Sequence, residues 1–152
     1  MRRVLKPGGV AGIRCIDLGG TLFWPDPEGT LAHGNTLWAR YRTSAGGDPH
    51  MGRKLRGLLR EAGFARTEGS AGGEAWATPE RIETFLPALI EEFTGPRIAA
   101  AARKHGWADD AEMAAIRQAL ETWARAPDAY MSIAWGEVVG WRVAKPSETS
   151  RS

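Results

Sequence analysis

The stretch RRVLKPGGVAGIRCIDL, residues 2–18, decides the fold of this chain. Within it, residues 5–9 read Leu-Lys-Pro-Gly-Gly. The proline presets one backbone dihedral angle and the glycines accept positive φ, so this segment predicts a tight turn. The apolar residues of 10–18 then occupy both alternating faces, which is typical of a strand that is covered on both sides. The stretch therefore predicts a layered α/β fold, in which this strand has neighbours.

The segments after this strand predict a loop and two helices. Glycine, proline and aspartate are frequent in residues 17–30, which favours a loop. A short helix is expected over 35–47, with Asn35 as its N-cap. A second helix is expected over 48–63, with Asp48 as its N-cap, because apolar residues recur there at helical spacing.

The rest of the chain predicts a strand, a helical region and a final strand. Residues 64–79 predict a strand that glycines weaken. Helical spacing follows up to residue 126, with helix starts at Thr78 and Asp109. Residues 128–143 are rich in aromatic and β-branched side chains, which favours a last, buried strand.

Composition excludes several classes of protein. The chain has 152 residues, 43% hydrophobic and 25% charged, which suits one globular domain with a core. Its net charge is only +2 and its arginines alternate with acids, so no nucleic-acid partner is expected. A single cysteine permits no internal disulfide, and no apolar run approaches the ~20 residues that span a bilayer. We therefore expect a cytoplasmic protein with no membrane partner.

Two motifs carry a resemblance to a known family. The segment RRVLKPGGVAGI, residues 2–13, resembles the entry into the fifth strand of class I S-adenosylmethionine-dependent methyltransferases. The segment GRKLRGLLREAGF, residues 52–64, resembles the helix that leads into their sixth strand and ends in Ala-Gly-Phe. The ubiquinone and menaquinone C-methyltransferase type is the most similar subgroup.

The resemblance implies a specific arrangement of the chain. Residues 1–144 are expected to form the C-terminal half of a Rossmann-like methyltransferase sheet, namely its strands five, six and seven. The last strand would be the seventh, inserted antiparallel between the fifth and the sixth. A helical insertion is expected at about 79–126, before that strand, and a disordered tail at 145–152.

The resemblance also implies S-adenosylmethionine as cofactor and a small molecule as methyl acceptor. The family binds its cofactor at a glycine-rich turn after the first strand, and an acid at the end of the second strand holds the ribose. No strand of this sequence is followed by G-x-G-x-x-G, and Met1 aligns with the helix before the family's fifth strand. We therefore expect the C-terminal portion of such an enzyme, without cofactor-binding residues and inactive alone.

Substrate-binding residues are expected near the carboxyl end of the first strand, where ligands of open α/β sheets lie. Asp17 would orient a substrate hydroxyl, act as a weak base or cap the loop. Phe23 lies beside Trp24, which would form an aromatic wall for the acceptor, stack near the cofactor's sulfonium or pack the loop against the sheet. His33, in the predicted loop, would act as a general base. His50, in the first turn of a helix, is expected to be solvated. The histidines and the cysteine show no metal-ligand spacing, and no catalytic residue is assigned.

Two other functions fit the same sequence. One is a non-catalytic helical interaction module, in which residues 79–126 form a partner-binding surface rather than a lid over an acceptor. The other is a domain that completes its sheet with a second chain, including a copy of itself, through an exposed strand edge.

Overall fold

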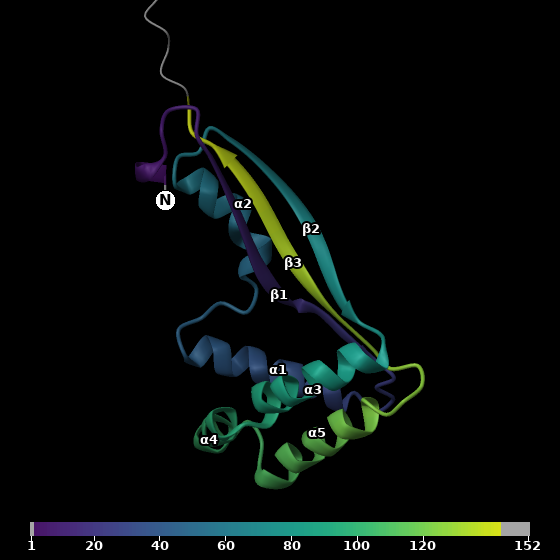
Figure 1. Cartoon of the computed structure of the whole chain (residues 1–152). Helices are drawn as coiled ribbons and strands as arrows, with labels where there is room; N and C mark the ends of the chain where they lie inside the picture. Colours follow the sequence, from purple (N-terminus) through teal and green to yellow (C-terminus); the bar gives the residue numbers. More distant parts are fainter. Residues whose placement is uncertain (1, 144–152) are drawn as a thin grey trace, which may run out of the picture. The chain divides into compact units, whose positions relative to one another are not determined.

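The structure of the chain, a computed structural model, describes residues 2–143 (Figure 1). The disordered tail expected at 145–152 lies outside the described residues. The strands are β1 (Val10–Trp24), β2 (Arg66–Trp76) and β3 (Tyr130–Trp141). The helices are a 3-10 turn (Arg2–Val4), α1 (Thr30–Ser44), α2 (Met51–Glu61), α3 (Pro79–Thr94), α4 (Pro96–His105) and α5 (Asp110–Trp123). The α/β class is thereby confirmed.

The last strand lies in the middle of the sheet. The strand order is β1-β3-β2, so β3 pairs with both of the others. The backbone N–H of Arg142 donates to the carbonyl of Gly9, and that of Ala65 donates to the carbonyl of Trp141. The end of β3 therefore meets the beginnings of β1 and β2, and β3 is antiparallel to both (Figure 1). The expected antiparallel placement of the last strand between the other two is confirmed.

The described chain divides into two compact units. The first is made of residues 2–17, 50–72 and 135–143, and the second of 18–49 and 73–134. The boundary falls within each of the three strands. Each helix belongs wholly to one unit: α2 to the first, and α1, α3, α4 and α5 to the second.

The first unit has a core between α2 and one side of its strands. Leu55 and Leu59, one helical turn apart on α2, are buried against Ala11 of β1 and Val138 of β3. Phe64, which follows the helix, completes this cluster. Burying side chains of this size contributes about 1.5–3 kcal/mol each, so the amphipathic face of α2 holds the unit together.

The second unit is a helical cluster with its own core. Four helices, α1, α3, α4 and α5, pack on one another. Gly34 in α1 lies against Phe93 of α3 and Ile116 of α5, where a Cβ atom would come within 2.8–3.0 Å of both side chains. The predicted N-caps at Thr78 and Asp109 are confirmed, the latter as a full capping box with Glu112.

The predicted loop at 17–30 is wrong over its first part, because β1 continues to Trp24. Phe23 supplies the reason, since its ring packs edge-on against Phe93 and Trp123 and extends the strand into the second unit's core. Glycine-rich sequence adopts strand conformation here because tertiary burial outweighs local preference.

Both predicted helix starts before residue 64 are also displaced. The helix α1 begins at Thr30, and Asn35 is inside it, donating from its amide to the carbonyl of Leu18. The helix α2 begins at Met51, with His50 rather than Asp48 at its N-cap.

Candidate functional site

Asp17 anchors a polar cluster in the first unit. Asp17, on β1, is only 7% exposed. It accepts two hydrogen bonds from Arg53 of α2, from Nε at 2.6 Å and from Nη2 at 2.7 Å. This fork-to-fork geometry is the strongest form of an arginine–carboxylate pair. The hydrogen bonds and the negative charge of Asp17 raise the pKa of Arg53 above its ordinary value.

The same carboxylate orients His50. The Nδ1 atom of His50 lies 3.3 Å from Oδ1 of Asp17. An ionised carboxylate only accepts hydrogen bonds, so Nδ1 of His50 is the donor in this contact. The imidazole is 42% exposed, which leaves it accessible. Asp17, Arg53 and His50 together form a carboxylate-oriented imidazole of the kind that accepts protons in enzymes.

A glycine at the start of α2 brings this cluster together. A Cβ atom at Gly52 would lie 2.8 Å from the carbonyl oxygen of Cys15 and 3.1 Å from Cβ of Asp17. Only glycine allows α2 to approach β1 so closely. Because Arg53 follows Gly52 directly and His50 is two residues earlier, both side chains are within reach of Asp17.

Sequence reasoning assigned Asp17 to substrate binding, and that contact stays a prediction. What the structure adds is that its carboxylate holds Arg53 and His50. His50 was expected to be merely solvated, and its hydrogen bond to Asp17 corrects that expectation. The pairing could not be seen in the sequence, because 33 residues separate His50 from Asp17.

The predicted aromatic residues lie in the second unit. The Phe23 ring is half-buried, 5.9 Å from the Phe93 ring and 5.5 Å from the Trp123 ring between centroids. Trp24 is 61% exposed, and its indole N–H donates to Asp128 at 3.1 Å. Its carbonyl accepts a 2.9 Å hydrogen bond from the indole of Trp123. Phe23 and Trp24 are thus gathered around Trp123.

His33 was placed in a loop, and this placement is wrong. It lies in the first part of α1, where it is exposed and its backbone N–H donates to Gly29.

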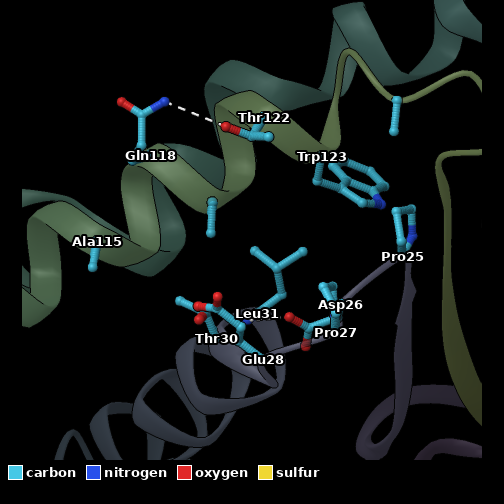
Figure 2. Close-up of a pocket in the computed structure, with 12 residues that line it drawn as sticks. Pro25, Asp26, Pro27, Glu28, Thr30, Leu31, Ala115, Gln118, Thr122 and Trp123 are labelled. Atoms are coloured by element: carbon cyan, nitrogen blue, oxygen red, sulfur yellow. Dashed lines mark hydrogen bonds between the residues drawn. The ribbon is translucent and has the colours of Figure 1, made fainter.

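A pocket of about 460 Å³ lies within the second unit (Figure 2). One wall is the loop after β1 with the start of α1, and the other is one face of α5 and the residues that follow it. Apolar side chains dominate its lining: Pro25, Pro27, Leu31, Ala115, Ala119, Trp123 and Ala126.

Five polar residues complete the lining of the pocket. Gln118 donates to the hydroxyl of Thr122 at 3.3 Å on α5. Asp26 accepts from the backbone N–H groups of Leu31, at 3.1 Å, and Ala32, at 2.9 Å. The other two are Glu28 and Thr30. Asp26 therefore caps α1 from outside the helix and holds this wall in place.

The described residues contain no group of three histidine, cysteine or acidic side chains that could hold a metal ion. Within the same part of the chain, the helices are too short or too polar to cross a membrane.

Comparison with known proteins assigns no family: no family model and no curated protein matches this chain. The fold and the two sites are the basis for a function.

Proposed function

We propose that this chain is the acceptor-side portion of a class I S-adenosylmethionine-dependent methyltransferase that acts on a small molecule. The observation that carries the proposal is the position of β3, antiparallel between β1 and β2. The resemblance described above implies this arrangement for the fifth, seventh and sixth strands of that fold.

The direction of the outer strands supports the same proposal. Since β1 and β2 are both antiparallel to β3, they run parallel to each other, as two strands of a doubly wound sheet do. In the first unit, α2 comes between them in sequence and packs on the sheet, as a crossover helix does. The turn before β1 and the end of α2 use glycine at positive φ, 80° at Gly8 and 81° at Gly63.

The described residues do not fit the cofactor itself. The sequence from β1 to α1 contains Asp26, whose carboxylate already occupies the N–H groups of Leu31 and Ala32 where a ligand would bind. The connection from β2 to α3 is short, and Thr78 caps that helix with its own side chain. Neither connection is a glycine-rich turn. We therefore place the cofactor's binding site on other strands.

The edge position of β1 offers a place for those strands. Of the described strands, β1 pairs only with β3, so its other edge can accept a further strand. The same edge favours a second candidate function, pairing with another copy of this chain. A strand that belongs to a cofactor-binding half is preferred, because it also accounts for the order of the described strands.

Within this proposal, His50 moves a proton. The Asp17 carboxylate, 3.3 Å from Nδ1, orients the imidazole, and the proposal assigns this ring to accept a proton from the methyl acceptor. Arg53 occupies both oxygens of Asp17 and is a positioning residue.

The test extends the coding region on its 5′ side and asks what the longer polypeptide contains and does. We expect a strand–G-x-G-x-x-G–helix unit, binding of S-adenosylhomocysteine in calorimetric titration, and transfer of a labelled methyl group. The 152-residue chain alone is the matched control and is expected not to bind. Tight binding by the control, or an upstream region without such a unit, would contradict the proposal.

Size-exclusion chromatography of the 152-residue chain tests the second candidate. Self-pairing through β1 requires a stable dimer. A monomer that becomes active only in the extended polypeptide supports the methyltransferase.

A further inference from the structure

We propose that the pocket of the second unit is a binding site for a small, largely apolar molecule that carries no negative charge. This site is separate from the proposed proton-transfer cluster and does not depend on the methyltransferase proposal. All of its lining residues belong to the second unit.

The size of the pocket suits a small molecule. Its volume of about 460 Å³ falls in the range of ligand sites, which are mostly apolar with a few polar groups. Water gains few hydrogen bonds in such a space, so an apolar ligand that displaces it is favoured.

The space remains because α5 and the residues that follow it present small side chains on this face. Ala115, Ala119 and Ala126 line the pocket, whereas the neighbouring Ile116 and Leu120 are buried in the helical core. Larger residues at the alanine positions would fill the space with the protein's own atoms.

The walls are held in place before any ligand arrives. The Trp123 indole is fixed by its hydrogen bond to the Trp24 carbonyl and by its edge contact with Phe23. The opposite wall is held by Asp26, whose carboxylate accepts two backbone hydrogen bonds from α1. A rigid site loses little conformational entropy on binding.

The charges around the pocket select against anions. Its lining contains two carboxylates, Asp26 and Glu28, and no lysine or arginine. The N-terminus of α1 compensates the charge of Asp26. Glu28 is exposed and forms no ion pair with any residue from 2 to 143, so its charge repels an acid and attracts an amine. Gln118 and Thr122 offer hydrogen bonds to an uncharged polar end.

The experiment uses the full chain with isotope-labelled alanine methyl groups, observed by NMR. Three probes share one ring system: naphthylmethylamine, naphthylmethanol and naphthoic acid. We expect saturable shifts at Ala115, Ala119 and Ala126, with a Kd at or below about 1 mM for the amine and the alcohol. The acid should bind a few-fold or more weakly, and Glu28→Gln should remove the amine's advantage over the alcohol.

Matched substitutions on α5 separate the pocket from the rest of the surface. Ala119→Phe places a ring in the space and should weaken the amine at least about tenfold. Ala114→Phe, on the same helix but outside the pocket, should leave its binding unchanged. If Ala119→Phe fails to fold, Ala115→Phe takes its place. Tightest binding by the acid, absence of shifts at the pocket alanines, or equal loss in Ala114→Phe overturns the proposal.

Discussion

The carbonyl oxygen of Gly52, in the first turn of α2, lies directly against Gly136 of β3, and no Cβ atom fits between them. The helix and the central strand touch through their backbones at this point. The same approach brings Arg53 and His50 to Asp17, so the polar cluster depends on it.

Gly136→Ala is therefore expected to destabilise the protein by about 1–3 kcal/mol or more, because the added methyl group forces α2 away from the sheet. Urea unfolding measures the loss of free energy. Gly12→Ala is the matched control, since a Cβ atom there meets nothing within 4 Å. Equal losses in both variants would show that α2 does not pack against β3 in this way.

Arg53→Met should lower the unfolding temperature by several degrees, because it removes the principal partner of Asp17, whose side chain is only 10% exposed. Arg60→Met, at an exposed position on the same helix, should change it much less. Asp17→Asn should cost less than Arg53→Met, since the Arg53 side chain is 58% exposed and water can solvate it. A larger loss in Asp17→Asn than in Arg53→Met would mean that the Asp17–Arg53 ion pair does not stabilise this region as described.

Glu92, on α3, should make stability depend on pH. Partial burial raises the pKa of its carboxyl above the ordinary 4.5, and the nearby Arg42 opposes this shift. Between the ordinary and the raised pKa, the folded state holds more protons than the unfolded state, so stability falls as pH rises through that window.

Glu92→Gln removes this charge and should stabilise the protein at neutral pH, by under about 1 kcal/mol because water screens the partly exposed group. Below the ordinary pKa the difference should disappear. Urea unfolding at the two pH values measures this, with Glu83→Gln, an exposed position on α3, as control. If Glu92→Gln remains more stable than the unsubstituted protein below the ordinary pKa, the gain has a cause other than the ionisation of Glu92.

In the extended polypeptide described above, His50→Gln should lower methyl transfer roughly 10²-fold or more while the circular dichroism spectrum stays unchanged. His33→Gln, at an exposed position on α1, should retain activity within about twofold of the unsubstituted protein. Loss of activity in His33→Gln alone would restore His33 as the base.

The parts of the fold that depend on local chemistry could be predicted from the sequence. Thr78 and Asp109 cap helices through hydrogen bonds that reach only three residues ahead. The helix over 51–61 follows from the spacing of Leu55 and Leu59. The position of β3 between its neighbours was predicted from the resemblance to a known fold. The spacing of apolar residues alone does not say which strands pair.

The predictions of element bounds and side-chain contacts are wrong where residues far apart in the sequence determine the local structure. Gly19 and Gly20 favour a loop locally, but the strand continues because the Phe23 ring packs edge-on against Phe93 and Trp123. The start of α1 was missed because its cap, Asp26, precedes the helix by several residues. Asp17 was recognised as a polar residue at a strand, yet its partners come from a helix that follows much later in the chain.

The central position of β3 has a consequence for how the protein is made. During translation β1 and β2 leave the ribosome before β3, and neither pairs with the other in the finished sheet. Their common partner, Tyr130–Trp141, is synthesised last among the described elements. Until it emerges, two strands have unpaired backbones, which favours premature association with other nascent chains. Helices α3, α4 and α5 can assemble during this interval, and chaperone binding in the cell is expected to last until the final strand is complete.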